Sequence, residues 1–450
     1  MSRSNVREAA LDVLLKVEKN QAYSHLLLNQ TMNSHRITGK DAGLFTEIVY
    51  GTIQRQKTID YFLSPFVKKP LAKLDGWVHL LLRMTVYQTV YLDRVPERAA
   101  FHEAVQIAKK RGHKGIAGMV NGVLRSLQRE GLPSFDDISD PIKRIAVEYS
   151  HPEWLVARWA EQFGQEKAAR ICRANLEHPE QTARVNLTKS SVENAAEMMR
   201  EEGLEVSAGG LVPEALTVSQ GAIARSRAFQ DGAVSIQDES SMLVARALGA
   251  GEGETVLDAC AAPGGKSSHI AETMNNRGKI ESLDIHQHKV QLIEEQKNRL
   301  GLTIIHPRVL DARKAGGVFA EDTFDKILVD APCSGLGVIK RKPDLKWSKK
   351  EEDISRLGEI QLDILKSVWP LLKPGGTLVY STCTVDKEEN SRVSSEFYAH
   401  TDNAVKDAEM KNRLPEKLRD RCQDGAELAL FPDDYGTDGF YIHSFRKKES

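Results

Sequence analysis

The second half of the chain alternates short β-branched runs with helical patterns, and this alternation constrains the fold more than any other feature. Between residues 254 and 445 we predict six strands, with the sequences ETVLDAC, GKIESLDI, IIHPRVLDA, FDKILVDAP, GGTLVYSTC and GFYIHSFRK. Helical patterns such as QHKVQLIEEQKNRLG lie between them. Strands that alternate with helices predict a parallel, doubly wound α/β sheet, which binds its ligands beyond the carboxyl ends of the strands.

Acidic and thiol side chains follow these strands at the point where each strand ends. The first four strands end at Asp258 and Cys260, at Asp284, at Asp311, and at Asp330 and Cys333. An aspartate at such a place is most often a turn residue or a helix cap. Because the carboxyl ends of parallel strands meet at one edge of a sheet, four such ends in a row favour a ligand site over capping alone.

The loop after the first strand reads DACAAPGGKSSHI and indicates the class of ligand. It lacks the GxGxxG of a dinucleotide site, and the first glycine of a GxxxxGK[ST] phosphate loop is missing before Lys266. A turn that contains Gly264 and Gly265 lets backbone N–H groups approach a ligand, and the next helix N-terminus favours a carboxylate. The amino-acid end of S-adenosylmethionine fits such a loop. Asp284 could then accept from the ribose hydroxyls, and Asp311 from the exocyclic amine of adenine.

Two cysteines at strand exits indicate what a methyl donor would be used for. Cys333 follows the fourth strand in VDAPCSG and Cys383 follows the fifth in YSTCTV, and neighbouring parallel strands lie about 5 Å apart. Carbon 5 of cytosine becomes nucleophilic when a thiolate adds to carbon 6, so one cysteine can attack while the other assists proton removal and release. Asp330 is placed to bind N3 and the exocyclic amine. The base must be single-stranded or flipped out.

Packing and metal binding are the simpler interpretations of the cysteines. Taken alone, Cys383 is typical of a packed thiol at a strand end. A zinc site built from Cys260, Cys333 and Cys383 lacks local ligand spacing, and five scattered cysteines without a CxxC pair argue against disulfides. Cys172 and Cys422 stand outside any motif. For Cys260 we expect the backbone to matter more than the sulfur.

A basic segment, IKRKPDLKW, follows the fourth strand. We expect its cations to hold an RNA backbone phosphate, with Trp347 nearby. These cations are Lys340, Arg341, Lys342 and Lys346.

Residues 1–130 consist of amphipathic helical patterns. They carry 20 Lys and Arg against 11 Asp and Glu, a net charge of +9, whereas the whole chain carries −1. This asymmetry favours a polyanionic partner for the first third of the chain. The segments FTEIVYGTIQRQKTID, LLRMTVYQ, HEAVQIAKKRG and VNGVLRSL resemble, in order, the NusB-type RNA-binding helical domain. The candidate phosphate contacts that this resemblance implies are Lys109, Lys110, Arg111, Lys114 and Arg125.

Three long motifs in the second half resemble the NOL1/NOP2/Sun family of cytosine-5 RNA methyltransferases. They are DACAAPGGKSSHI, DAPCSGLGVIKRKPDLKW and YSTCTVDKEEN, and GAVSIQDESSMLV and GTDGFYIHSFRKK match the family's flanking segments. The resemblance implies that Cys383 is the nucleophile, that Cys333 acts in product release and that Asp330 contributes to catalysis. The donor-binding positions that it implies are Cys260, Ala261, Ala262, Pro263, Gly264, Gly265, Lys266, Asp284, Asp311 and Asp330.

The pairing of a NusB-like domain with this catalytic domain resembles the bacterial members of the family that act on 16S ribosomal RNA. We therefore expect a multidomain protein with an all-α NusB-like bundle over 1–130, a linker and small helical/α+β module over 131–235, and a Rossmann-like class I methyltransferase domain over 236–450. S-adenosyl-L-methionine is the expected cofactor and no metal is expected. The expected partner is unassembled or partly assembled 16S ribosomal RNA, with no membrane and no obligate protein partner.

Length and composition agree with a protein of this kind. A chain of 450 residues predicts two to four domains, and 41% hydrophobic with 28% charged residues is typical of soluble proteins. No apolar run reaches 18 residues and the start lacks a secretory signal, so we expect a cytoplasmic protein. Two alternatives stay open: a non-catalytic RNA-binding or antitermination factor, which would need neither strand-end cysteine, and the same chemistry on transfer RNA.

Overall fold

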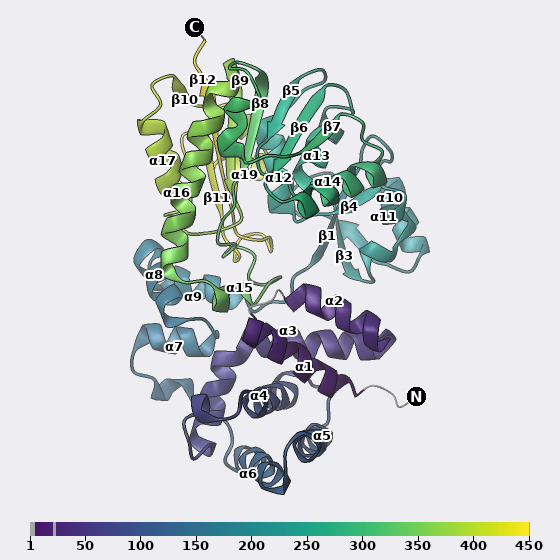
Figure 1. Ribbon diagram of the computed structural model, residues 1–450, viewed down its shortest axis with the longest axis vertical. Helices are drawn as coiled ribbons and strands as arrows, with labels where there is room; N and C mark the ends of the chain where they lie inside the picture. Colours follow the sequence, from purple (N-terminus) through teal and green to yellow (C-terminus); the bar gives the residue numbers. More distant parts are fainter. Residues whose placement is uncertain (1–4, 21–23, 450) are drawn as a thin grey trace. The chain divides into compact units, whose positions relative to one another are not determined.

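The computed structural model describes residues 5–20 and 24–449, and the chain divides into two compact units (Figure 1). Unit 1 consists of Met1–Glu177 and Ile339–Lys349, and unit 2 consists of His178–Val338 and Lys350–Ser450. A short segment from the second half of the sequence therefore belongs to the N-terminal unit. We call this segment, Ile339–Lys349, the strap.

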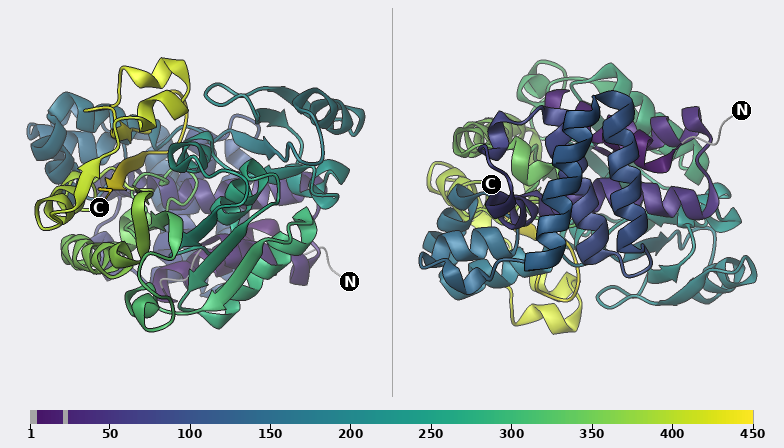
Figure 2. Two further views of the ribbon diagram at one scale, coloured as in Figure 1. Left: turned by 90° about the horizontal axis from the view of Figure 1, so that it is seen from above. Right: turned by 90° about the horizontal axis from the view of Figure 1, so that it is seen from below.

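Unit 1 is helical. Its N-terminal bundle contains α1 (Val6–Asn20), α2 (Ser24–His35), α3 (Gly39–Leu63), α4 (Gly76–Tyr91), α5 (Glu97–Arg111) and α6 (Lys114–Glu130). Three helices follow, α7 (Pro141–Glu148), α8 (Glu153–Phe163) and α9 (Gln165–Ala174), and the strap adds α15 (Leu345–Ser348). The paired α5 and α6, drawn in blue, lie side by side in Figure 2.

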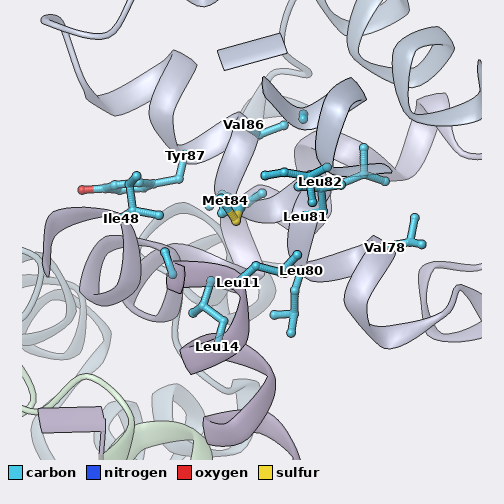
Figure 3. Close-up of a cluster of buried hydrophobic side chains, with 14 of the residues drawn as sticks. Leu11, Leu14, Ile48, Val78, Leu80, Leu81, Leu82, Met84, Val86 and Tyr87 are labelled. Carbon is cyan, nitrogen blue, oxygen red and sulfur yellow. The ribbon is translucent and has the colours of Figure 1, made fainter. Parts of the chain in front are cut away.

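Helix α4 forms the centre of the bundle because its sequence, GWVHLLLRMTVYQTVY, is apolar around most of its circumference. Figure 3 shows its buried side chains from Val78 to Tyr87 among Leu11 and Leu14 of α1 and Ile48 of α3. By contrast, α6 carries a single apolar face, so it covers the bundle from outside. The sequence prediction of a helical N-terminal domain is confirmed.

A glycine lets α3 and α4 approach each other closely. A Cβ atom at Gly51 would lie 1.8 Å from the ring of Tyr87, so any larger residue would force the helices apart. The hydroxyl of Tyr87 then donates to Glu47 of α3 at 2.6 Å. The glycine of the VYGTIQRQ segment therefore has a packing role.

Unit 2 begins with a small module built on a four-stranded antiparallel sheet in the order β2-β3-β1-β4. Its elements are β1 (Gln181–Val185), α10 (Val192–Glu201), β2 (Glu205–Ala208), β3 (Ala215–Gln220), α11 (Arg227–Gln230) and β4 (Val234–Ile236). We call residues 181–236 the β1–β4 module. Alternating apolar residues bury one face of its sheet against α10, which gives the module its own small core.

The rest of unit 2 is an α/β domain around an eight-stranded sheet. Its strands are β5 (Thr255–Asp258), β6 (Lys279–Asp284), β7 (Ile305–Val309), β8 (Phe324–Asp330), β9 (Leu372–Thr382), β10 (Ala404–Lys406), β11 (Glu427–Leu430) and β12 (Phe440–Lys447). Its helices are α12 (Glu239–Leu248), α13 (Gly265–Thr273), α14 (Gln287–Leu300), α16 (Glu351–Val368), α17 (Ser391–Ala399), α18 (Met410–Arg413) and α19 (Glu416–Arg419).

Five neighbouring strands of this sheet, β7-β6-β5-β8-β9, are parallel, as the sequence predicted. The last predicted strand differs from the prediction, because β12 pairs antiparallel with β9. Tyr441 near the start of β12 lies opposite Thr382 at the end of β9, so β12 has to run back along its neighbour. The strand order reverses direction between β5 and β8. Such a switch point is where an open α/β sheet leaves a crevice for a ligand.

Candidate active site

A cleft of about 350 Å³ opens at the switch point, in the part of the α/β domain where the parallel strands end. Its lining includes six of the residues that the sequence predicted for the site, contributed from five strand ends. They are Cys260, Asp284, Asp311, Asp330, Cys333 and Cys383. Positions far apart in the sequence meet here because parallel strands carry their carboxyl ends to the same edge.

The loop between β5 and α13 makes a tight turn beside this cleft. Gly264 has a φ of +102°, which favours glycine, and its N–H donates to the carbonyl of Ala261 at 2.7 Å. A Cβ atom at Gly264 would lie 3.2 Å from the backbone of Ile293 in α14. Nothing surrounds the Cβ position of Gly265, the first residue of α13. The turn thus brings unshielded N–H groups of a helix N-terminus to the cleft, a ready site for a carboxylate.

A buried carboxyl group forms a hydrogen bond that stabilises this turn. Asp258 at the end of β5 accepts from the hydroxyl of Ser267 at 2.6 Å, and burial raises the pKa of Asp258 to about 7. Asp258 is fully buried, so it supports the loop rather than facing the cleft.

Two aspartates line the other side of the cleft. Asp284 at the end of β6 accepts from the backbone N–H of His286 at 2.9 Å. Asp311, which follows β7, forms an ion pair with Arg313 at 2.7 Å, and the hydrogen bond from Arg313 lowers the pKa of Asp311. Sequence reasoning missed Arg313 as the partner. A cation two residues beyond the acid in LDAR was the available signal.

An ion pair crosses the cleft from the loop to β8. The ammonium group of Lys266 lies 2.7 Å from one carboxylate oxygen of Asp330, and Ser381 donates to the other oxygen at 2.8 Å. Burial by itself would lower the pKa of Lys266, but the carboxylate of Asp330 raises it above its ordinary value. Asp330 is therefore held in a fixed orientation by two donors.

The two strand-end cysteines are in contact. The Sγ atoms of Cys333 and Cys383 lie 3.4 Å apart, and both side chains are half-buried. The contact with Cys383, together with burial, raises the pKa of Cys333 well above its ordinary value. Burial thus favours the protonated form of Cys333, and in the contact either sulfur can donate its proton to the other.

A buried polar network holds the two cysteine loops in register. The carboxylate of Glu389 accepts from both the N–H and the hydroxyl of Ser334, at 2.8 and 2.5 Å. The hydroxyl of Ser334 also lies 3.0 Å from that of Thr384, so the neighbours of both cysteines are joined. Gln361 of α16 donates to Glu389 at 3.1 Å and to the carbonyl of Pro332 at 2.9 Å. Burial raises the pKa of Glu389 to about 7.

Sequence reasoning missed both Glu389 and Gln361. Glu389 stands in the KEEN end of the second cysteine motif, YSTCTVDKEEN, which was a usable signal. Nothing in the sequence around Gln361 sets it apart from other residues of an amphipathic helix.

The basic segment after the fourth strand corrects one prediction. Lys346 of the strap is fully buried in unit 1 and donates to the backbone carbonyl of Gln54 at 2.8 Å, while Trp347 donates to that of Ile53 at 2.8 Å. Lys340 is also buried. The prediction that Lys346 holds an RNA phosphate is therefore wrong, because burial removes its ammonium group from solvent. Burial also lowers the pKa of Lys346 to about 7.

Two of the basic residues proposed to contact RNA in the N-terminal bundle have acidic partners on α1. Lys110 pairs with Glu8 at 2.8 Å and Arg111 pairs with Asp12 at 2.7 Å. These pairs lower the local positive charge at the end of α5. All five candidate phosphate contacts, Lys110 and Arg111 included, stay predictions.

Within residues 5–20 and 24–449 no three His, Cys, Asp or Glu side chains come together in a way that could hold a metal ion. Over the same residues no helix combines the length and the apolar character that crossing a membrane requires.

The parallel sheet with its antiparallel edge, and the glycine-rich loop at its switch point, define a Rossmann-like methyltransferase. Residues 245–446 match the family described as 16S rRNA methyltransferase RsmB/F, residues 4–129 match the NusB family, and residues 151–224 match the ferredoxin-like domain of RsmF/B-like methyltransferases. The chain belongs to the RsmB/F family.

Relatives and solved structures agree with this membership. The chain is 56% identical to a protein of Bacillus subtilis named "Probable ribosomal RNA small subunit methyltransferase B", over 100% of both chains. It is 33% identical to the ribosomal RNA small subunit methyltransferase B of Klebsiella pneumoniae, over 89% of this chain and 91% of that protein. Among solved structures, PH0851 is similar with a TM-score of 0.81 and 26% identity over 98% of each chain. A methyltransferase homologue from Pyrococcus horikoshii has a TM-score of 0.58 and 28% identity, over 69% of this chain and 100% of its own.

Proposed function

We propose that this protein methylates carbon 5 of a specific cytosine in 16S ribosomal RNA, in the cytoplasm, with S-adenosyl-L-methionine as methyl donor and through a covalent adduct. Membership in a family of 16S rRNA methyltransferases supports the RNA target and the donor. The observation that carries the cytosine-5 chemistry is the pair of contacting thiols, Cys333 and Cys383, in one cleft with Asp330. Unassembled or partly assembled RNA is the proposed form of the substrate.

The residues around the cleft fit the donor. The unshielded N–H groups at the start of α13 can bind its carboxylate, Asp284 can accept from its ribose, and Asp311 can accept from its adenine amine. The donor supplies an electrophilic methyl group bound to a sulfonium. The loop from Cys260 to Lys266 would hold the amino-acid end, as the open space at Gly265 leaves room for a close backbone approach.

In the proposed reaction the thiolate of Cys383 adds to carbon 6 of cytosine. A carbon–sulfur bond forms, and the electron pair of the broken carbon 5–carbon 6 double bond makes carbon 5 able to attack the methyl group. N3 takes up a proton as the sulfur adds, and the carboxylate of Asp330 accepts from this N3–H group and from the exocyclic amine, which stabilises the charge at N3. When carbon 5 takes the methyl group, the bond from this group to the donor's sulfur breaks. A water molecule then accepts the carbon 5 proton, and the electron pair of that carbon–hydrogen bond restores the double bond and expels the sulfur of Cys383. Cys333 acts in this release by giving a proton to the departing sulfur.

The thiol contact supports a shared role for the two cysteines. A thiolate on one sulfur would accept a hydrogen bond from the other thiol, which stabilises the thiolate. The assignment of Cys383 as the nucleophile comes from the resemblance of YSTCTVDKEEN to the family motif. Cys333 then holds a proton that it can give to the sulfur of Cys383 during release.

A direct test compares ribosomal RNA from cells with and without this protein by bisulfite sequencing, since 5-methylcytosine resists deamination. We expect one cytosine of 16S RNA to lose protection without the protein. Purified protein and methyl-labelled donor should also yield 5-methylcytidine in unassembled 16S RNA, identified by nucleoside mass spectrometry. A label that appears only in transfer RNA, or only in another nucleoside, would contradict the proposal.

A further inference from the structure

A buried arginine of the β1–β4 module reaches the proposed donor loop. Arg184 of β1 is fully buried, and its guanidinium forms a two-pronged ion pair with Glu272 of α13 at 2.7 and 2.8 Å. The same guanidinium donates to the side chain of Gln237 and to the backbone carbonyl of Gly265 at 3.1 Å. Arg184 therefore binds both the first and the last turn of α13.

A second buried contact joins the module to the same helix. Glu214, which precedes β3, lies 3.4 Å from the imidazole of His269 and pairs with Arg246 of α12. His269 and Glu214 are both buried. Two residues of the module, Arg184 and Glu214, thus contact side chains that lie three positions apart along α13, Glu272 and His269.

Gly265, the first residue of α13, has no packing of its own, although Ala261 and Gly264 earlier in the loop are packed against their neighbours. Gly265 carries no side chain and its Cβ position is surrounded by open space, while Gly264 adopts a conformation that most residues avoid. A glycine turn of this kind stays in one conformation only if contacts from another segment restrict its backbone. The hydrogen bond from Arg184 to Gly265 provides such a contact at the first residue of α13. The N–H groups proposed to bind the donor begin at this residue.

We infer that the β1–β4 module is part of the donor site, and that Arg184 is a positioning residue which fixes the first turn of α13 for S-adenosylmethionine. The planar guanidinium suits this role because its N–H groups point in fixed directions and can donate to a carboxylate and a carbonyl at the same time. The inference rests on the proposed binding of the donor at the Cys260–Lys266 loop. It gives a function to a module whose sequence indicated only a connecting segment.

The test must distinguish loss of the contact between Arg184 and the loop from unfolding of the protein. Removing Arg184 alone would leave Glu272 buried and unpaired, which is strongly destabilising, so both charges are removed together in the double variant Arg184→Met/Glu272→Met. The matched control is Arg299→Met. Arg299 of α14 donates to the module carbonyls of Phe229 at 2.6 Å and Val234 at 3.0 Å, so its removal loosens the module but leaves the hydrogen bond from Arg184 to Gly265 in place.

Binding of S-adenosylmethionine to the full-length protein is measured by calorimetry without RNA, together with the melting temperature. We expect the double variant to bind the donor about tenfold more weakly, and the Arg299→Met protein to bind within about twofold of wild type. With RNA present, the KM for the donor should rise in the double variant while kcat at saturating donor stays within about threefold. If the double variant does not fold, Arg184→Lys takes its place. This variant keeps the positive charge but loses the planar set of guanidinium N–H donors, and it should weaken donor binding in the same way.

A folded double variant with wild-type donor affinity would overturn the inference, as would equal weakening by Arg299→Met, which would indicate general loosening of the module. Wild-type protein that fails to bind the donor would instead refute the proposed donor site. The two failures are therefore distinguishable.

Discussion

The sulfur atoms of Cys333 and Cys383 lie 3.4 Å apart in the cleft, although 50 positions separate them in the sequence. The strands that precede them, β8 and β9, are parallel neighbours, and Asp330 lies opposite Ser381 in their register. Each cysteine follows its strand at a similar distance, so both arrive at the same edge of the sheet. This relationship allows two thiols to act on one base, with separate roles that single substitutions can distinguish.

Substitution Cys383→Ala is expected to abolish methyl transfer, by more than about a thousandfold, because no nucleophile remains to add to carbon 6. Donor affinity should change little, since the proposed donor loop lies on the β5–α13 side of the cleft. Methyl incorporation into 16S RNA and calorimetric donor binding measure the two effects. Turnover close to wild type in this variant would contradict the proposed mechanism.

Substitution Cys333→Ala is expected to leave the attack intact and to slow release of the product. A protein–RNA adduct that survives denaturation should then accumulate, visible as a shifted band on a denaturing gel with labelled RNA. The double variant Cys333→Ala/Cys383→Ala is the matched control and should form no adduct. Absence of the shifted band from the single variant would argue against a release role for Cys333.

Substitution Asp330→Asn is expected to lower kcat about 100-fold, because the neutral amide no longer stabilises the charge of the adduct. It also removes the partner of Lys266, which is 2.7 Å away. Ser381→Ala removes the neutral donor at 2.8 Å but keeps the ion pair, and should therefore cost much less. Single-turnover methyl transfer at saturating donor measures both. Equal effects of the two substitutions would show that the charge is not what matters.

Substitution Glu389→Leu is expected to separate the two cysteine loops, since Ser334 would lose both of its bonds to the carboxylate. Diamide, which couples two thiols into a disulfide and is itself reduced to a hydrazine, reports on the sulfur contact. We expect the Cys333–Cys383 disulfide to form about tenfold more slowly than in wild type, as measured by peptide mass spectrometry. Glu389→Gln keeps an acceptor for Ser334 and should react like wild type. An unchanged rate in the leucine variant would show that Glu389 does not hold the loops.

The burial of Lys346 predicts a pH dependence of unit 1 stability. Its pKa is about 7 in the folded protein, below its ordinary value near 10.5. Between these values the unfolded chain binds the proton and the folded protein does not, so the free energy of unfolding should rise with pH over this window. At pH 7 the penalty is present, and Lys346→Met should be more stable than wild type by about 1–3 kcal/mol. The difference should shrink by pH 10 in urea denaturation. A difference that grows with pH would show the opposite sign.

The architecture could be predicted from the sequence because its signals are local. A strand is visible as a β-branched run, and a parallel sheet places successive strand ends at one edge, so Asp284, Asp311, Asp330 and the two cysteines could be expected in one cleft. The helical character of residues 1–130 followed from periodicity in the same way. The direction of β12 could not be predicted, because it depends on which end of β9 the returning chain reaches.

Burial of polar residues was the main feature that the sequence did not reveal. Lys346 stands in a run of cations that is typical of a phosphate-binding segment, yet the strap is packed into unit 1. Glu389 and Arg184 also stand in ordinary-looking surroundings, and each gains its role from partners 55 to 88 positions away.

By itself, the sequence determined the order of the domains, the parallel strands and the chemistry at their ends, since residue type and short spacing fix these. The tertiary structure alone decided which polar groups are buried and what they hold: Glu389 between the cysteine loops, Arg184 against α13, Lys346 inside the helical unit. The physical reason is that desolvation and hydrogen bonding depend on packing between distant segments, which no local pattern of residues encodes.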